Sequence, residues 1–244
     1  MNIVIPMAGA GKRLAGHDSG RPKPLIQVEG RPLWHWATGC LPLDKAERLV
    51  FVCLKEHVDF FDLKRSIEKD LSSLPVHVRV LDSVTDGQLR TVVSARDLFE
   101  STCSTLIFNA DTWFRHNEPT FLDSCRSHDG TLGVADREGD RWSFARLGEH
   151  GRVVEVAEKR RISPLASTGL YHFSDTQKFL ADADVALSES TETVEHYVAP
   201  LYQRMIDRGD SIGVVRADEF LPIGTPDELE FFIARMRTSG PTDA

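Results

Sequence analysis

Glycines and cations are concentrated in one short stretch that follows the first apolar run of the chain. From Gly9 to Leu25 the sequence reads GAGKRLAGHDSGRPKPL, directly after the opening MNIVIPMA. Glycines let backbone N–H groups curl around an anion, because no Cβ stands in the way. Residues 12–23 contain four cations and one acid, and Pro22 and Pro24 fix the backbone on either side of Lys23. This convergence predicts a polyphosphate site rather than a merely solvated basic loop.

Neither of the two best-known phosphate motifs fits this stretch. The dinucleotide fingerprint GxGxxG needs a third glycine where the chain has Leu14. The P-loop GxxxxGK[ST] needs a glycine where the chain has Pro6, and a Ser or Thr where it has Arg13. What remains is a glycine pair at the carboxyl end of the first predicted strand, where open α/β sheets bind their ligands.

Apolar runs of strand length alternate with helical patterns, and between 141 and 173 strands follow one another closely. The alternation predicts an α/β fold with a mostly parallel sheet and helices on both faces, and the closely spaced strands predict a small antiparallel insertion. We expect strands at 2–7, 48–54, 76–81, 104–110, 130–135, 141–147, 152–158, 167–173 and 211–217, and helices at 32–39, 57–71, 87–100, 118–128, 193–209 and 225–237.

Composition places the chain among ordinary globular proteins. The 244 residues are 41% hydrophobic and 27% charged, and they carry a formal net charge of −8. We expect one domain over 1–238 and a disordered tail over 239–244. The acidic balance argues against general nucleic-acid binding. The chain has four scattered cysteines, no signal-peptide pattern and no apolar run of membrane-spanning length, so we expect a cytoplasmic protein without a membrane partner.

Several motifs, taken in order, resemble one family. The opening PMAGAGKRL…RPKPLIQVEGRPLWHW, followed by DGQLRTVVSAR, LIFNADTWF, VAEKRRISPLASTGLYHF and FLPIGTPDELEFF, is similar to the sugar-1-phosphate nucleotidyltransferases, the nucleoside-diphosphate-sugar pyrophosphorylases. The resemblance runs from about 1 to 235. It implies a Rossmann-like fold that binds an NTP and Mg²⁺, on which a phosphorylated acceptor attacks the α-phosphate and releases pyrophosphate.

By this resemblance the nucleotide lies at the glycine-rich stretch. Arg13 and Lys23 would contact the phosphates, and Asp111 would hold Mg²⁺, although a carboxylate at a strand end can also simply cap the next turn. Gln88 either reads an edge of the nucleobase or caps the helix that follows it. The full set implied for nucleotide binding is Met7, Ala8, Gly9, Ala10, Gly11, Lys12, Gln88, Thr91 and Asn109.

The acceptor is expected on the opposite side, at the strand-rich insertion. The resemblance assigns it to Glu158, Lys159, Thr168, Gly169 and Glu195. Because two arginines follow Lys159, a solvated basic turn competes with this role. An acid such as Glu195 is also favourable near a helix start for reasons unrelated to binding.

One position departs from the family pattern. A second metal carboxylate usually precedes the family's IGT motif, and here that position is Pro222. Either Asp111 suffices alone, or Asp218 or Glu219 substitutes for the missing carboxylate, or catalysis is weakened or lost.

The sequence therefore predicts a Mg²⁺-dependent nucleotidyltransferase whose partners are an NTP and a phosphorylated small molecule, most simply a sugar 1-phosphate. The alternatives are the same chemistry on a non-sugar phosphate, as in a cytidylyltransferase, and a catalytically inactive nucleotide-binding homologue. The identity of the NTP, that of the acceptor, and the oligomeric state, a homo-oligomer included, stay open.

Overall fold

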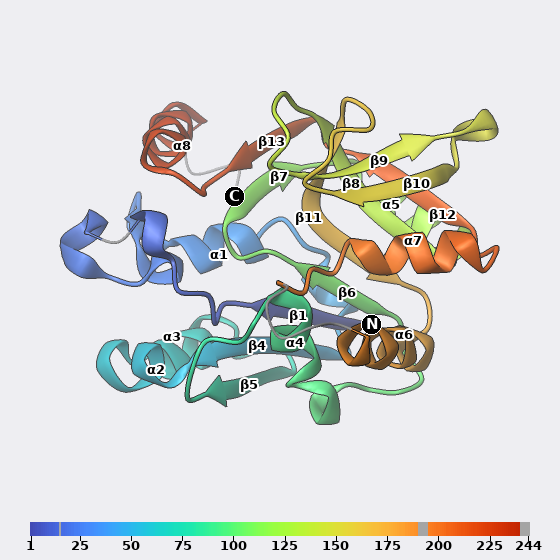
Figure 1. The fold of residues 1–244 in the computed structure, drawn as a ribbon. Helices are drawn as coiled ribbons and strands as arrows, with labels where there is room; N and C mark the ends of the chain where they lie inside the picture. The colour runs from blue at the N-terminus through green and yellow to red at the C-terminus, as the bar shows by residue number, and fades with distance from the viewer. Residues whose placement is uncertain (15, 190–194, 240–244) are drawn as a thin grey trace.

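The computed structural model describes residues 1–14, 16–189 and 195–239 (Figure 1). Its strands are β1 (Asn2–Pro6), β2 (Gln27–Val28), β3 (Arg31–Pro32), β4 (Arg48–Leu54), β5 (Val76–Leu81), β6 (Thr105–Phe108), β7 (Thr112–Arg115), β8 (Gly130–Asp136), β9 (Ser143–Leu147), β10 (Val153–Glu158), β11 (Leu165–Phe173), β12 (Ile212–Arg216) and β13 (Glu219–Pro222). Its α-helices are α1 (Leu33–Thr38), α2 (Lys55–Phe61), α3 (Leu63–Asp70), α4 (Gln88–Val93), α5 (Glu118–Ser127), α6 (Thr176–Ser188), α7 (Pro200–Asp207) and α8 (Pro226–Ser239).

A nine-stranded sheet forms the centre of the molecule. β1 pairs in parallel with β4 on one side and β6 on the other, and β5 extends the parallel part beyond β4. β11 then pairs antiparallel with β6, β8 and β9, and β10 closes this section by pairing antiparallel with β9. The predicted α/β class, with its mostly parallel sheet and antiparallel insertion, is confirmed.

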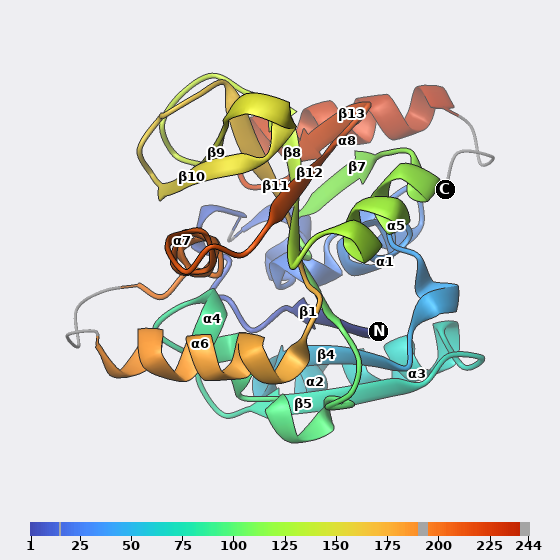
Figure 2. The ribbon, with the colours of Figure 1, turned by 90° about the vertical axis from the view of Figure 1, so that its right-hand side faces the viewer.

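Alternating side chains bury both faces of the sheet. On β1, Ile3 and Ile5 join one apolar cluster while Val4 joins another. The first cluster includes side chains of α1, α3 and α5, and the second includes side chains of α4, α6 and α7. Figure 2 shows these two groups of helices on opposite sides of β1 and β4. The sequences of the central strands are therefore continuous apolar runs, as expected for a sheet that helices cover on both faces.

A third apolar cluster connects the two ends of the chain. Leu14 and Ile26, which flank the basic stretch, pack with Leu229 and Phe232 of α8. The same cluster includes Trp113 of β7, which pairs antiparallel with β13. α8 thus supports the segment that carries the predicted phosphate-binding residues.

The predicted helix 57–71 is wrong, because the structure has two helices there. α2 begins at Lys55 and ends at Phe61, and α3 begins at Leu63. Between them Asp62 adopts a left-handed conformation, with φ of 53°. Aspartate tolerates this region better than most residues, so neither glycine nor proline marks the break in the sequence.

The predicted helix 87–100 is also too long. α4 ends at Val93, and a separate 3₁₀ turn follows at Arg96–Leu98. The Ser94 hydroxyl donates to the carbonyl of Thr91, a local bond that competes with continued helix.

The predicted helix 193–209 begins later than expected, at Pro200. Residues 193 and 194 lie outside the described part, and 195–197 are not helical. The backbone of His196 is instead bonded to another loop: its N–H donates to the carbonyl of Asp86, and its carbonyl accepts from the N–H of Leu89, both at 2.9 Å. A tertiary contact therefore overrides the local helical pattern.

Helix α6 and strands β7 and β13 were not predicted from the sequence. α6 carries a clear local signal, since the Asp175 side chain caps it by accepting from the N–H groups of Gln177 and Lys178. At the other end of the chain, α8 continues one residue past the predicted domain boundary to Ser239. The rest of the expected disordered tail, 240–244, lies outside the described residues.

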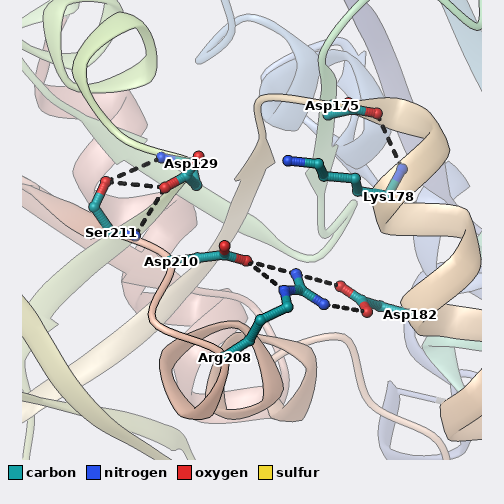
Figure 3. A network of polar contacts seen from close by, with 7 residues as sticks. All are labelled: Asp129, Asp175, Lys178, Asp182, Arg208, Asp210 and Ser211. Carbon is teal, nitrogen blue, oxygen red and sulfur yellow. Dashed lines mark hydrogen bonds and ion pairs between the residues drawn. The ribbon is translucent and has the colours of Figure 1, made fainter.

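Figure 3 shows a polar network that joins α6 to the turn after α7. Because β11 runs antiparallel to β6, and β6 runs parallel to β1, this network lies at the end of the sheet opposite the glycine-rich loop. Arg208 forms a bidentate pair with Asp182, at 2.7 and 3.0 Å, and a second pair with Asp210. Nearby, Asp129 accepts from the N–H and hydroxyl of Ser211. Each of these acids has a partner inside the network, which suits a structural role. Within the described residues, no helix has the length and apolarity needed to cross a membrane.

Candidate active site

One cavity of about 990 Å³ lies at the carboxyl ends of β1 and β6. Its opposite wall comes from the antiparallel section, β9 to β11. Of the residues proposed for the site, all but Asp218 and Glu219, the two substitutes for the missing carboxylate, line this cavity: Met7, Ala8, Gly9, Ala10, Gly11, Lys12, Arg13, Lys23, Gln88, Thr91, Asn109, Asp111, Glu158, Lys159, Thr168, Gly169 and Glu195. The fold thus brings the predicted nucleotide and acceptor residues together around one space.

The glycine-rich loop leaves β1 with its backbone donors unused. The N–H of Met7 still pairs with β4, at 2.8 Å from the carbonyl of Val52. The N–H groups of the next four residues, 8–11, donate to no acceptor among the residues the structure describes. Gly11 has φ of 58°, and a Cβ there would stand 3.2 Å from the Cβ of Lys23. The loop therefore offers unpaired donors and brings Lys23 close to the backbone.

Lys23 and Asp111 form an ion pair in the lining of the cavity, with Nζ 2.7 Å from Oδ2. Lys23 begins a 3₁₀ turn bounded by Pro22, and its side chain is only 12% exposed. Asp111 directly precedes β7, and its carbonyl accepts from the N–H of Ile223. The lysine is aimed by a rigid backbone on one side and by a carboxylate on the other.

The carboxyl of Asp111 is electrostatically suited to stay ionised. Burial raises its pKa, but the charge and hydrogen bond of Lys23, together with the charge of Arg13, outweigh burial and hold the pKa below its usual value. While Oδ2 bonds Lys23, Oδ1 accepts a single long hydrogen bond from the described residues, that of the Thr112 hydroxyl at 3.4 Å. One carboxylate oxygen is thus left to bind a cation.

These donors fit Mg²⁺ in one specific way. In the described part of the chain, no group of three or more His, Cys, Asp or Glu side chains could hold a metal. Mg²⁺ commonly takes one or two carboxylates and completes its shell with substrate phosphates and water. Asp111 suits that arrangement, in which the protein supplies a hard oxygen and the nucleotide supplies the rest.

Two of the other three cations of the opening stretch have no charged partner among the described residues, whereas the third, Arg21, lies 3.8 Å from the Asp18 carboxylate. Lys12 and Arg13 are exposed, and neither forms a hydrogen bond or ion pair with the rest of the described chain. The guanidinium of Arg13 lies beside Gly224, where a Cβ would stand 3.7 Å from one of its nitrogens. Both cations are available for an anionic ligand.

Gln88 and Asn109 contact each other across the cavity floor. The Gln88 amide donates to the Asn109 side-chain oxygen, and the helix cap is Gly87 instead. The predicted capping role of Gln88 is therefore wrong, whereas its role in reading a base stays a prediction. The Thr91 hydroxyl is already bonded to Thr85, at 2.6 Å, and to the Gly87 carbonyl, so it fixes the turn before α4.

The turn at Gly87 is pressed against the segment 195–197. Gly87 has φ of 148°, and a Cβ at this position would lie 2.4 Å from both the N and the O of His196. Only glycine permits this approach. The loop that carries Gln88 and the segment that carries Glu195 therefore form one packed unit.

Thr168 and Gly169 lie in an irregular part of β11, where its register with β8 shifts. Gly169 has φ of 83°, and a Cβ there would lie 2.7 Å from the Asn109 amide nitrogen. Its carbonyl accepts from the N–H of Asn109, at 3.2 Å. Gly169 thus lets β11 approach Asn109 closely, while the Thr168 hydroxyl is buried and has no hydrogen-bond partner among the described residues.

Glu158 ends β10 on the acceptor wall and accepts a hydrogen bond from the Ser143 hydroxyl. Burial raises its pKa, against the smaller lowering effects of Ser143 and Lys159. A half-buried carboxyl facing a cavity is a good acceptor for ligand hydroxyl groups.

Lys159 contacts side chains from a distant part of the sequence. Its ammonium donates to the Tyr197 hydroxyl, lies 4.5 Å from the centre of that ring, and is 3.5 Å from the Glu195 carboxylate. A lysine in a merely solvated basic turn would not make these contacts. Glu195 lies in the non-helical segment before α7, so the predicted explanation that it begins a helix is wrong.

The structure keeps the two candidate substitutes for the missing carboxylate away from Asp111. Pro222 pairs with Thr112, next to Asp111, and lines the cavity. Asp218 is outside the lining, and its N–H donates to the carbonyl of Arg115 at the far end of the β13–β7 pair. Glu219 is paired with Arg115 and Arg235.

Further polar and aromatic residues of the cavity were not predicted. They include Arg141, Ser143, Tyr197 and Glu228. The Glu228 carboxylate accepts from the N–H of Gly224, at 2.8 Å, and from Arg141. Local sequence offers no signal for these residues, because each reaches the cavity through pairing between distant segments.

Comparisons with known proteins place the fold. A nucleoside-diphosphate-sugar pyrophosphorylase from Vibrio cholerae RC9 is 30% identical and superposes with a TM-score of 0.82, over 95% of this chain and 99% of that one. The inositol-1-phosphate CTP transferase from T. maritima is 20% identical, with a TM-score of 0.75 over 98% of this chain and 96% of its own, and it supports the fold alone.

Two of the relatives found by sequence are each 23% identical to this chain. The glucose-1-phosphate thymidylyltransferase of Xanthomonas campestris pv. campestris aligns over 85% of this chain and 70% of its own length. The bifunctional protein GlmU of Methanocaldococcus jannaschii aligns over 81% of this chain, which spans only 47% of that relative. No family model matches the sequence.

Proposed function

Because the chain belongs to the nucleoside-diphosphate-sugar pyrophosphorylase family, we propose that it transfers a nucleoside monophosphate from an NTP to a sugar 1-phosphate and releases pyrophosphate. The observation that carries this proposal is the shared cavity: unpaired backbone donors and three cations at one end, and Glu158 with Lys159 at the other. The thymidylyltransferase relative, whose printed name specifies glucose 1-phosphate, supports a sugar phosphate as the acceptor.

In this proposal the opening stretch binds the triphosphate. The N–H groups of 8–11 and the side chains of Lys12 and Arg13 contact phosphate oxygens, since they have no partner within the described chain. Lys23 lies between the glycine loop and Asp111, so its ammonium is held where negative charge develops on the transferring and leaving phosphates. Preorganised charges of this kind are the main source of catalysis in phosphoryl-type transfer.

Asp111 would hold Mg²⁺ through the oxygen that Lys23 leaves unoccupied. The bound ion would neutralise charge on the phosphates. The residues of the chain supply positioning and electrostatics, and no general base is required, because the attacking acceptor phosphate is already an anion.

At the opposite end, Lys159 binds the phosphate of the acceptor, and Glu158 accepts hydrogen bonds from its hydroxyl groups. Gln88 and Asn109, which contact each other, face the nucleobase. Transfer then depends on holding the acceptor oxygen in line with the α-phosphate, a positioning effect that is lost steeply with misplacement.

The test is pyrophosphate release measured for four NTPs crossed with a panel of acceptors. The panel should include several sugar 1-phosphates, inositol 1-phosphate and phosphocholine, each with Mg²⁺ and with EDTA. We expect one sugar 1-phosphate to dominate with one NTP, and EDTA to abolish turnover. If only a non-sugar phosphate supported turnover, the proposed acceptor would be wrong, and the proposed nucleotidyl transfer would stand.

An inactive nucleotide-binding protein is a second candidate, favoured by Pro222 beside Asp111. It predicts that NTP binds in a calorimetric titration while no acceptor yields pyrophosphate. A matched variant sharpens the choice: Pro222→Asp should raise activity if the missing carboxylate limits catalysis, and should leave it unchanged or lower if Asp111 suffices.

A further inference from the structure

We propose that Tyr197 is a positioning residue for the acceptor: it holds the Lys159 ammonium against the wall of the cavity in the orientation that receives the acceptor phosphate. This inference rests on the proposed function and adds a residue to it. Tyr197 lines the cavity, lies in the non-helical segment before α7, and was not predicted from the sequence.

Lys159 needs a support because its own backbone provides little. It follows β10 with φ of 50°, an uncommon conformation for a lysine, and its N–H donates to the carbonyl of Trp142 at 2.9 Å. This fixes its Cα, but the side chain is long and 54% exposed. An exposed ion pair between a lysine and a single carboxylate contributes little, because solvent screens the attraction and holding both side chains in place costs conformational entropy.

Tyr197 contributes two contacts that a carboxylate alone does not. Its hydroxyl accepts from the Lys159 ammonium and donates to the Glu195 carboxylate, so it bridges the two charges. Its ring lies under the ammonium, 4.5 Å from the centre, which is within the range of a cation–π contact. Together these contacts hold the Lys159 ammonium beside Tyr197 and restrict the rotamers of the long side chain.

The support is itself rigidly mounted. His196, between Glu195 and Tyr197, donates to the carbonyl of Asp86 and accepts from the N–H of Leu89, both at 2.9 Å. These bonds fasten the segment 195–197 to the loop that carries Gln88. Tyr197 is therefore a fixed point beside the loop that carries Gln88, and the Lys159 side chain reaches it from the end of β10.

The neighbours that position the Lys159 ammonium also favour its protonated form. The hydrogen bond to Tyr197 is the largest cause that raises the pKa of Lys159, and the Glu195 carboxylate adds to it. The charge of Lys159 in turn lowers the pKa of the neighbouring Glu158 carboxyl, although burial raises that pKa more strongly. A fully protonated lysine with a fixed orientation suits a phosphate dianion.

The experiment compares wild type with Tyr197→Phe, which keeps the ring and removes the hydroxyl. We expect the acceptor KM to rise about tenfold, the size expected for losing one hydrogen bond to a charged group, with kcat reduced less and NTP affinity unchanged. Tyr197→Ala should have the larger effect. Tyr202→Phe is the matched control, because its hydroxyl bonds Thr131 and His172 inside the core; it should lower stability without raising the acceptor KM.

A second measurement needs no substrate: competitive acylation of lysines with peptide mass mapping. Lys55 is the internal reference, since it is 55% exposed and pairs with Asp59 outside the cavity. Loss of the Tyr197 hydroxyl should lower the pKa of Lys159 and speed its labelling severalfold relative to Lys55. Unchanged labelling together with an unchanged acceptor KM would overturn the inference while wild-type turnover keeps the proposed function intact.

The two proposals fail in different ways. If wild type releases no pyrophosphate with any pair of substrates, the proposed function is overturned. Labelling then still decides the contact: faster modification of Lys159 in Tyr197→Phe supports its positioning by Tyr197, and unchanged modification overturns it.

Discussion

The cavity holds a lysine at each end, and the two lysines are held by different means. Lys23 is 12% exposed, sits in a turn between two prolines, and lies 2.7 Å from Asp111. Lys159 is 54% exposed and is held by the side chains of Tyr197 and Glu195. Backbone and burial fix the first lysine, whereas side chains from another segment fix the second.

This difference suggests a division of tasks. A triphosphate is common to every NTP, so a rigid site built on backbone geometry serves all of them. The acceptor varies more within such a fold. Because Lys159 is held by side chains and not by its own backbone, substitutions of those side chains can alter its wall of the cavity without disturbing the loop after β1. Five predictions test the contrast, from the largest expected effect to the smallest.

Asp111→Asn should lower kcat by about a thousandfold or more, because it removes the charge proposed to hold the metal and leaves Lys23 without its ionic partner. The measurement is pyrophosphate release, with circular dichroism to verify folding. Asp44→Asn is a suitable control, since Asp44 also pairs with a lysine but lies outside the cavity. Near-normal turnover in Asp111→Asn would remove this residue from the site.

Lys23→Ala and Arg13→Ala should each cost about 2–4 kcal/mol of transition-state stabilisation, measured as kcat/KM. Lys23→Arg should not restore activity fully, because a planar guanidinium does not replace an aimed ammonium. If both alanine variants match wild type, the phosphate role of the opening stretch is wrong.

Lys159→Ala should lower kcat/KM for the acceptor by about a hundredfold, since the phosphate it binds is also the nucleophile. NTP affinity, titrated without acceptor, should stay the same. Arg208→Ala serves as the control, because it breaks a network at the opposite end of the sheet (Figure 3) and should affect stability only. Weakened NTP binding with an unaltered acceptor KM would move Lys159 to the triphosphate.

Gly87→Ala should disturb both ends of the cavity at once. Its Cβ would meet the His196 backbone at 2.4 Å, in a conformation that non-glycine residues rarely adopt. We expect NTP affinity and acceptor KM each to worsen by about tenfold, in contrast to the selective effects of the lysine variants. An effect on only one substrate would show that the two segments adjust independently.

The smallest effect is on acid stability. The pKa of Asp111 is lowered in the fold, so its contribution is present above the unfolded pKa, about 3.9, and is lost as pH falls through the folded pKa. Because its side chain is 39% exposed, solvent screening should keep this contribution under about 1 kcal/mol. The free energies of unfolding of wild type and Asp111→Asn, measured in urea, should differ at pH 7 and approach each other as the pH falls below the unfolded pKa of about 3.9; a constant difference would contradict the ion pair as its source.

Much of the fold was predictable where burial imposes a local pattern. The strands 48–54 and 76–81 were predicted to the residue, because a strand buried on one or both faces is recognisable from its apolar residues. The break at Asp62 was missed because an aspartate in a left-handed turn leaves little mark on a helical pattern. The late start of α7 was missed because hydrogen bonds from a distant loop decide it.

By itself the sequence determined the parts of the site that follow a strand directly: the glycine loop after β1 and Asp111 after β6. Their positions depend on glycine, proline and strand ends, which act over a few residues. Only the tertiary structure decided that Lys23 meets Asp111 across a separation of 88 residues, and that Tyr197 meets Lys159 across 38. Such contacts depend on the order of the strands and on the connections between them. Two side chains that meet across a cavity therefore leave no periodic pattern in the local sequence.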